Sequence, residues 1–321
     1  MAYIRTCMKG PNTIFPFNHP FIKYPQYASV KMDGERMINL CGEAMISPSL
    51  KLMRNKNLRN HAVEFFDFCK SARLVTDCEI WSPIRSFHMP NKEEGISSIL
   101  SSYDREIPDD IGFYVFDLMS EDEWDKSNEP IFFERYNSYW KALQGFKHVF
   151  PVIQFQVDTA EEAECFYNDQ ILSNQEGIIL RSPGAKYKHG RCTDHQDGMW
   201  KFKEFLTVDA TIVRIEEGDR LKDGMDRTTN LIGRLERRYD AAAYEPAGKV
   251  GAFVVRNEDG TEFKVKPGKG YNDAEKTRIW EDYVRFPEKW HGKHVEYKYM
   301  SHGTLDKPRI GSLVRFRPDK D

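Results

Sequence analysis

The chain has 321 residues, which is enough for two domains with separate cores. It is 40% hydrophobic and 30% charged, as is ordinary for a globular protein, and no run approaches the ~18 consecutive apolar residues of a membrane-spanning helix. The N-terminal residues lack the apolar core and cleavage site of a signal peptide, so we expect an intracellular protein without a membrane partner.

Charge gives no strong prediction of a nucleic-acid partner. The net charge is −3, with 23 Lys and Arg against 21 Asp and Glu in residues 206–321 and an acidic balance elsewhere. A local basic face can still bind phosphates, because such contacts act within a Debye length of about 8–10 Å. The six cysteines form no C-x-x-C pair, so neither a zinc site nor a disulfide framework is expected.

The first 205 residues are predicted to form one domain of the α+β class. Residues 1–30, rich in Pro, Phe and Tyr, indicate an irregular or short-stranded lead-in. Apolar residues at helical spacing predict helices over 60–71 and 130–143, and Thr159 with Glu162 begins a third with a capping-box pattern. Short apolar runs bounded by Gly, Asp, Asn or Pro predict a mostly antiparallel sheet. The expected strands are Ala28–Val30, Met37–Leu40, Leu74–Val75, Phe113–Phe116 and Ile178–Leu180.

Residues 206–321 differ from the preceding part in that short strand-like segments with turn residues between them predominate. They are predicted to form a second domain. One helix is expected over Asp273–Tyr283, with Asn272 as its cap and Glu275 in the reciprocal position. Five short strands and one helix are typical of a small barrel such as an OB-fold. The expected strands are Val208–Glu216, Gly251–Asn257, Glu262–Lys266, His294–Tyr299 and Ser312–Phe316.

Residues 31–36 carry the pattern K-x-D-G-x-R, which begins at the end of a predicted strand. By itself the pattern could be an ordinary turn. A lysine that enters a tight glycine turn from a strand is, however, held rigidly and can approach a phosphorus atom. The ordinary lysine pKa is about 10.4, so fewer than about one molecule in a thousand carries the free amine at neutral pH. A nucleophilic Lys31 therefore needs cations, a metal or desolvation around it.

Four later segments follow this pattern in a fixed order. Each has an ordinary structural explanation, such as carboxylates and lysines that face water or an aromatic ring in a core. Taken as a series, the segments resemble the covalent nucleotidyltransferase superfamily of ATP-dependent DNA ligases, RNA ligases and mRNA capping enzymes. The segments are Asp77-Cys78-Glu79-Ile80, Phe116-Asp117-Leu118, Glu176-Gly177-Ile178-Ile179 and Trp200-Lys201-Phe202-Lys203.

The resemblance implies an adenylation domain with a lysine nucleophile. Phe116 is expected to stack on adenine, Glu79 to contact the ribose, and Lys201 and Lys203 to act as catalytic cations at the α-phosphate. Mg²⁺ or Mn²⁺ is expected at Asp33, Glu79 and Glu176, since hard cations prefer carboxylate oxygens. The C-terminal pattern R-x-R-x-D-K at residues 315–320 resembles the ligase motif that closes over ATP. The full set expected to bind ATP is Lys31, Arg36, Glu79, Phe116, Glu176, Lys201, Lys203, Arg315 and Arg317.

Flanking segments favour a DNA ligase among these relatives. The turn Tyr187-Lys188-His189-Gly190-Arg191 and the barrel segment 251–275 look like DNA ligase sequences. The resemblance is closest to minimal two-domain ligases of bacteriophage type, without a large N-terminal DNA-binding domain or the features of NAD-dependent enzymes. Ser29 departs from the family, since several relatives have an acidic residue there that contacts the base. The residues expected to bind DNA are Arg36, Arg181, Lys188 and Arg191.

We therefore predict an ATP-dependent DNA ligase that seals 5′-phosphate/3′-hydroxyl nicks in double-stranded DNA through a lysyl-AMP intermediate on Lys31. It is expected to act as a monomer in the cytoplasm of a bacterium or a virus-infected host cell, in DNA replication, repair or recombination. Two alternatives stay open at this point. One is an RNA ligase of the same superfamily, and the other is a non-catalytic OB-type binder with a vestigial nucleotide site.

Overall fold

The computed structural model describes residues 2–89, 91, 94–126, 130–238, 240–303, 306–318 and 320. The chain divides into two compact units, residues 1–203 with 230–234 and residues 204–229 with 235–321. Both units combine helices with mainly antiparallel sheets, so the predicted α+β class is confirmed. Within the described residues, no helix has the length and apolar character that crossing a membrane requires.

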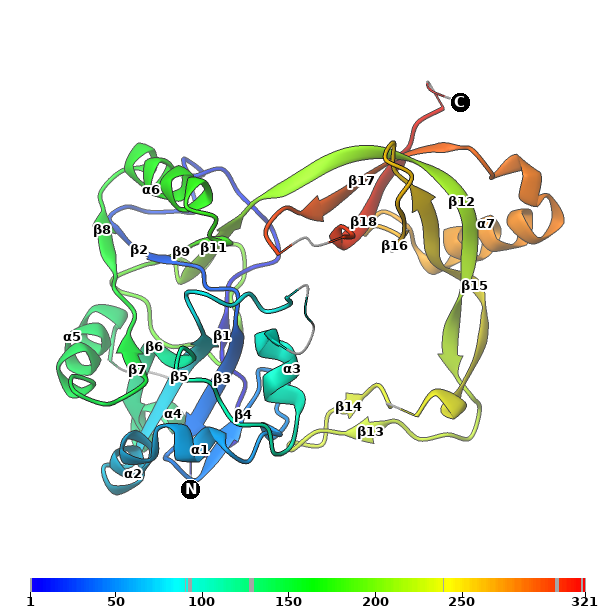
Figure 1. Cartoon of the computed structure of the whole chain (residues 1–321). Coiled ribbons are helices and arrows are strands. Elements are labelled where there is room, and N and C mark those ends of the chain that lie inside the picture. The colour runs from blue at the N-terminus through cyan, green and yellow to red at the C-terminus, as the bar shows by residue number, and fades with distance from the viewer. Residues whose placement is uncertain are drawn as a thin grey trace. The chain divides into compact units, whose positions relative to one another are not determined.

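The first sheet of unit 1 has the strand order β11-β9-β2-β8 and is antiparallel throughout. One of its faces packs on helix α6 (Ala160–Leu172) around a buried apolar cluster (Figure 1). Thr159 caps this helix by accepting a hydrogen bond from the Glu162 N–H, as the sequence predicts. The strands are β2 (Gln26–Val30), β8 (Phe155–Val157), β9 (Gly177–Arg181) and β11 (Met199–Lys203).

The second sheet of unit 1 has the order β4-β3-β5-β6-β7, in which only the β6–β7 pair is parallel. Met37, Cys78 and Phe113 lie in the large apolar core that α1, α2, α3 and α5 help to build. The strands are β3 (Glu35–Leu40), β4 (Ala44–Ile46), β5 (Leu74–Trp81), β6 (Gly112–Ser120) and β7 (Val149–Pro151).

The helix predicted over 60–71 is divided in two because Ala62 adopts a non-helical backbone conformation, with φ −143° and ψ 53°. The helix predicted over 130–143 is confirmed as α5. Sequence periodicity did not reveal α3 and α4, which are six residues each and too short for a clear pattern. The helices are α1 (Leu58–His61), α2 (Val63–Ser71), α3 (Ile96–Ser101), α4 (Glu121–Lys126) and α5 (Phe132–Ala142).

The N-terminal segment of unit 1 contains a short strand, as the sequence predicts. Strand β1 (Met8–Lys9) pairs in parallel with β10 (Gly190–Arg191), and Met8 is buried. This pairing brings Lys9 and Gly10 to the site described below.

Unit 2 is a five-stranded barrel with strand order β16-β15-β12-β17-β18. A parallel bridge between Lys266 and Ser312 joins the two edges. Helix α7 (Asp273–Arg285) packs on β15, and its predicted capping box forms between Asn272 and Glu275. The five strands are β12 (Phe205–Leu221), β15 (Tyr244–Arg256), β16 (Glu262–Val265), β17 (His294–Met300) and β18 (Arg309–Phe316).

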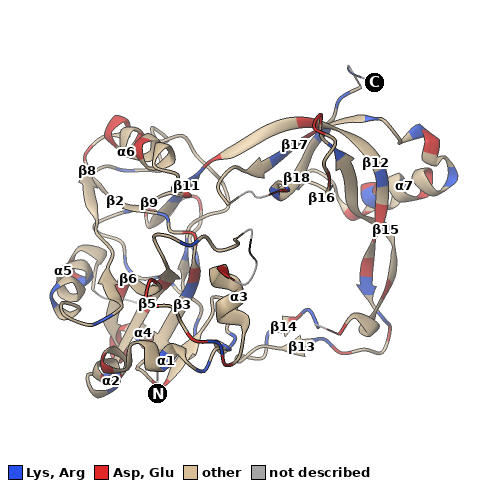
Figure 2. Ribbon diagram, in the orientation of Figure 1, with Lys and Arg blue, Asp and Glu red and all other residues tan. Residues whose placement is uncertain are grey.

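Between β12 and β15 lie a two-stranded hairpin, β13 (Thr228–Thr229) and β14 (Leu235–Glu236), and a 3₁₀ turn at Ala241–Ala243. A second 3₁₀ turn at Pro287–Lys289 follows α7. Both basic and acidic residues occur along β12 and β15 (Figure 2). Ion pairs join residues of opposite charge, such as Arg214 with Glu216 within β12 and Arg220 of β12 with Glu245 of β15. These strands therefore carry no surface of a single charge.

Candidate active site

Lys31 directly follows β2, a strand whose residues alternate between the core and a cavity. Ala28 is buried in the core beneath the sheet, whereas Ser29 and Lys31 line the cavity. The backbone N–H of Lys31 donates to the Gly177 carbonyl at 2.8 Å. Its Nζ forms an ion pair with the Glu176 carboxylate. The predicted nucleophile is thus held through both its backbone and its side chain.

The second sheet presents alternate residues of β3 and β5 to the same cavity. Arg36 lies opposite Glu79 in register, and both line the cavity. Cys78 faces the apolar core between Asp77 and Glu79, because successive side chains of a strand point to opposite faces. Arg36 donates from Nε and Nη2 to the two Asp77 oxygens at 2.8 and 2.5 Å. The Asp-x-Glu pattern therefore supplies one carboxylate that orients Arg36 and another that lines the cavity.

A β-bulge turns Phe116 toward the cavity. Asp77 pairs with Asp117, but the next residue of β5, Cys78, pairs with Val115, which leaves Phe116 as the extra residue of β6. A bulge of this kind re-aims a side chain and bends the strand. Phe116 lines the cavity, and the Arg36 guanidinium lies 4.9 Å from its ring centroid. The ring expected to stack on a base is therefore in the cavity wall.

The cavity between the two sheets has a volume of about 300 Å³, at the lower end of the range for small-molecule sites. Its charged lining is mainly basic and includes one carboxylate, Glu79. Such an arrangement suits a ligand that carries several negative charges. The charged residues in the lining are Lys9, Lys31, Arg36, Glu79, Arg181, Arg191 and Lys201.

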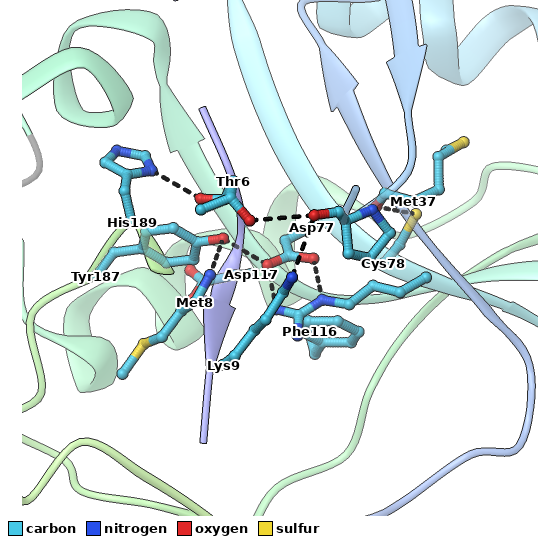
Figure 3. Close-up of polar contacts among 12 residues, drawn as sticks. Thr6, Met8, Lys9, Met37, Asp77, Cys78, Phe116, Asp117, Tyr187 and His189 are labelled. Carbon is cyan, nitrogen blue, oxygen red and sulfur yellow. Dashed lines mark hydrogen bonds and ion pairs between the residues drawn. The ribbon is translucent and has the colours of Figure 1, made fainter. Parts of the chain in front are cut away.

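A buried tyrosine contacts Asp77, the partner of Arg36 (Figure 3 shows Tyr187 and Asp77). The Tyr187 hydroxyl donates to Asp77 Oδ2 at 2.5 Å and accepts a hydrogen bond from the Met8 N–H at 3.1 Å. Burial and the neighbouring Asp77 carboxylate raise the pKa of Tyr187 well above its usual value, so the phenol keeps its proton and can donate. The N-terminal strand is therefore coupled to Arg36 through two intervening side chains.

Asp117 lies at the centre of a second buried charge cluster. It accepts hydrogen bonds from Arg135 at 2.7 and 3.2 Å and from Arg181 at 2.8 Å. Arg181, expected from the sequence to bind DNA, has only 3% of its surface exposed. Its guanidinium also lies 4.4 Å from the centroid of the Phe132 ring. The geometry thus gives Arg181 a role in the cavity wall and core.

The other predicted residues are distributed over both units. Lys201 lines the cavity on β11, and Lys203 lies 3.8 Å from Glu176. Arg191 also lines it and donates to the Gly10 carbonyl at 2.7 Å, whereas Lys188 donates to the Gln196 side chain. In unit 2, Arg315 pairs with Glu296, and Arg317 pairs with Asp209 and Glu296. Asp319 of the C-terminal motif lies outside the described residues.

Two carboxylates of unit 1, Glu79 and Glu176, are candidate ligands of a magnesium ion. Burial raises the pKa of the Glu79 carboxyl to about 8, against the opposing effect of the Lys31 and Arg36 cations. Glu176 also raises this pKa, so the two carboxylates act on each other electrostatically. In the described part of the chain, no three His, Cys, Asp or Glu side chains form a group that could hold a metal ion. Mg²⁺ commonly takes one or two carboxylates and completes its shell with water and substrate phosphates, and Glu79 with Glu176 fits that arrangement.

Sequence reasoning missed several residues of this cavity. Lys9 and Gly10 reach it through the β1–β10 pairing, and Gln154 reaches it from the segment between β7 and β8. Tyr187 belongs to a turn segment that resembles DNA ligase sequences, and the resemblance does not indicate that its hydroxyl supports Asp77. No local pattern marks these residues, because contacts with residues far along the chain bring each of them to the site.

Two family models match most of the chain. Residues 18–203 match a model described as the ATP dependent DNA ligase domain, which alone covers more than half of the sequence. Residues 245–317 match a model described as the DNA ligase OB-like domain, which confirms the predicted OB-fold. None of the curated proteins matches this chain.

Solved structures with the same fold include other ligases. One is a Lig E DNA ligase structure, described by the words "DNA binding with a minimal scaffold". It has a TM-score of 0.64 and 20% identity, and the match covers 96% of this chain and 99% of that one. Another, described as Pmar-Lig_Pre., has a TM-score of 0.69 and 19% identity, with 98% of this chain and 68% of that one covered. At 19% and 20% sequence identity, these similarities show a shared fold and nothing more.

Proposed function

This chain belongs to the ATP-dependent DNA ligase family, and we propose that it seals nicks in duplex DNA through an AMP adduct on Lys31. Residues 1–205 serve as the adenylation domain and residues 206–321 as the OB domain. The observation that carries this proposal is the convergence of Lys31, Glu79 and Phe116 on one basic cavity, with Glu176 paired to the lysine. The RNA ligase alternative has no support from the matched families.

The first proposed step is self-adenylylation. Lys31 Nζ loses its proton and attacks the α-phosphorus of ATP, so that an N–P bond forms as the bond to the leaving pyrophosphate breaks. Lys201 and Lys203 offset the charge that develops on the nonbridging oxygens. The cavity positions the nucleotide, with Phe116 against the base and Glu79 near the ribose. As is general for transfers at phosphorus, positioning and charge neutralisation carry most of the catalysis.

A divalent cation, Mg²⁺ or Mn²⁺, supplies further charge neutralisation at the phosphates. We propose Glu79 and Glu176 as its protein ligands, with Asp33 near the same turn. A bound cation would lower the raised pKa of Glu79, because it would favour the charged carboxylate. Arg315 and Arg317 of the OB domain are proposed to orient the pyrophosphate during this step, which implies that the domains move during the cycle.

The second and third steps act on DNA. The AMP passes from Lys31 to the 5′-phosphate of the nick, and the 3′-hydroxyl then attacks that phosphate and expels AMP. We propose that three basic residues contact the DNA directly: Arg36, Lys188 and Arg191. Arg181, also expected to bind DNA, would act on it from its place in the cavity wall. We propose that the enzyme works as a monomer in the cytoplasm. DNA replication, repair and recombination all leave nicks of this kind.

The test begins with intact-mass measurement of the purified protein after incubation with ATP and Mg²⁺. The expected result is one added AMP on the wild type, none on Lys31→Ala, and none when NAD⁺ replaces ATP. Sealing of matched nicks made of DNA only and of DNA containing RNA then distinguishes a DNA ligase from an RNA ligase. An adduct that persists on Lys31→Ala would refute the assignment of the nucleophile, and no adduct on the wild type would favour a non-catalytic binder.

A further inference from the structure

Three cavity residues form a row across the first sheet of unit 1, and a fourth lies beside its end. Ser29 pairs with Ile179, and Ile179 pairs with Lys201, in the registers of β2–β9 and β9–β11. On the other side, Ala28 pairs with Phe155, the first residue of β8, and Gln154 directly precedes Phe155 in the chain. All four residues line the cavity. Side chains directly opposite each other on such a face have Cβ atoms roughly 5 Å apart.

The two ends of this row differ in charge. Lys201 lies at one end, and Lys31 follows Ser29 by two residues on the same strand face. Gln154 lies beside the other end, and its neighbour Val152 is an apolar part of the lining. From β11, which carries Lys201, to β8, which Gln154 precedes, there are three strand spacings, or about 14 Å. A nucleotide laid along it with its phosphates at the lysines therefore directs its base toward Ser29 and Gln154.

Gln154 is well placed to read the edge of that base. Its backbone N–H donates to the Tyr136 hydroxyl at 3.3 Å, which fixes the segment between β7 and β8 against α5. A glutamine amide offers one acceptor and two donors. Adenine presents a 6-amino donor beside the N1 acceptor, so the amide can bond both atoms at once.

We propose that Gln154 is a specificity-determining residue that recognises the adenine edge during self-adenylylation. In this proposal the Gln154 carbonyl accepts from the 6-amino group and its NH₂ donates to N1, while Ser29 contributes the smaller, neutral side chain beside it. The inference rests on the proposed function, because it assumes that the cavity binds the ATP that modifies Lys31.

The test compares self-adenylylation with two nucleotides, ATP and purine riboside triphosphate, which lacks the 6-amino group. The rate of adduct formation at subsaturating nucleotide is followed by intact mass for the full-length wild type, Gln154→Met and Gln154→Glu. Gln154→Met keeps a similar side-chain volume but removes both hydrogen bonds. Gln156→Ala is the matched control, because Gln156 is exposed, bonds to Asp158 and is not among the cavity residues.

The wild type is expected to prefer ATP over the 6-deamino analogue by roughly tenfold, as one lost hydrogen bond of ordinary strength implies. Gln154→Met is expected to react more slowly with ATP and to lose most of this preference. Gln154→Glu should shift the preference toward GTP, because a carboxylate only accepts and the guanine edge offers donors at N1 and N2. Gln156→Ala should behave as the wild type.

An unchanged preference in Gln154→Met, or an equal loss with both nucleotides, would overturn the role of Gln154 while leaving Lys31 adenylylation intact. A wild type without any AMP adduct would overturn the proposed function, and the base-reading role with it. Thermal melting of each variant identifies any that fails to fold. Should Gln154→Met unfold, the GTP-to-ATP ratio of Gln154→Glu decides the question by itself.

Discussion

Lys31 and Glu176 lie 145 residues apart in the sequence, yet the lysine Nζ and the glutamate carboxylate form an ion pair. The residue after Glu176 holds the lysine backbone, since the Gly177 carbonyl accepts the Lys31 N–H. A lysine attacks phosphorus only as the free amine, and a carboxylate partner favours the charged form of an amine. Nucleotide binding must therefore change the surroundings of this pair before the lysine can attack.

Replacing Lys31 tests the centre of the proposed mechanism. Lys31→Ala is expected to abolish the AMP adduct and to lower nick sealing by at least about 10³-fold, because no other group can form the covalent intermediate. Labelling with radioactive ATP measures the adduct. Lys147→Ala removes an exposed lysine on the surface and should leave both activities unchanged.

Removing the Glu176 carboxylate should separate folding from catalysis. Glu176→Ala is expected to keep a thermal melting temperature close to that of the wild type, because the loss affects cavity lysines and no apolar core residue. Metal-dependent nick sealing should fall by at least about 100-fold, because the carboxylate is proposed to hold the cation that neutralises charge at the reacting phosphate. A variant that seals nicks at the normal rate would contradict the proposed role of this residue.

The Tyr187 hydroxyl is predicted to act through Asp77 on Arg36. Tyr187→Phe removes a hydrogen bond to a buried carboxylate, which contributes about 1.5–3 kcal/mol in such cases. We expect lower stability in urea and a higher KM for ATP, with kcat less affected, since Arg36 would lose part of its support. Tyr24→Phe is the matched control, because its hydroxyl donates to the Phe17 carbonyl outside the cavity lining. Equal effects of the two substitutions on KM would argue against this coupling.

The Asp117 cluster should dominate the stability of unit 1. Asp117→Ala leaves Arg135 and Arg181 without their shared carboxylate, and breaking a buried pair in this way typically costs about 3–5 kcal/mol. The free energy of unfolding from urea titration measures the loss. Asp67→Ala, which breaks an exposed pair with Arg59, should cost less than about 1 kcal/mol. A small loss for Asp117→Ala would show that water or other groups replace the carboxylate.

Glu79 makes stability depend on pH. Its folded pKa is about 8, against an ordinary value of 4.5, so between these pH values the folded protein holds a proton that the unfolded chain has released. The free energy of unfolding therefore falls as pH rises through this window, by up to about 5 kcal/mol at about 1.4 kcal/mol per pH unit. Glu79→Gln should remove this part of the slope. Urea titrations at pH 5, 6.5 and 8 measure the difference, and parallel curves for the two proteins would contradict the prediction.

The sequence by itself was sufficient for the family and for the type of fold. The order of five motifs along the chain resembles that of the ligase family, and the matched family models support the same family. The motifs contain Lys31, Glu79, Phe116, Glu176 and Lys201. The alternation of apolar and polar residues predicted the main strands, because a two-residue period is a local property of a strand. Capping residues predicted the starts of α6 and α7 for the same reason.

The tertiary structure alone decided which side chains share the cavity. The bulge at Phe116 depends on the β5–β6 register, and the row from Ser29 to Lys201, with Gln154 beside it, depends on three strand pairings. Lys9 and Tyr187 enter the site through contacts with residues far along the chain. Registers of this kind are set by the packing of whole sheets and by long-range hydrogen bonds, so no window of neighbouring residues contains the information.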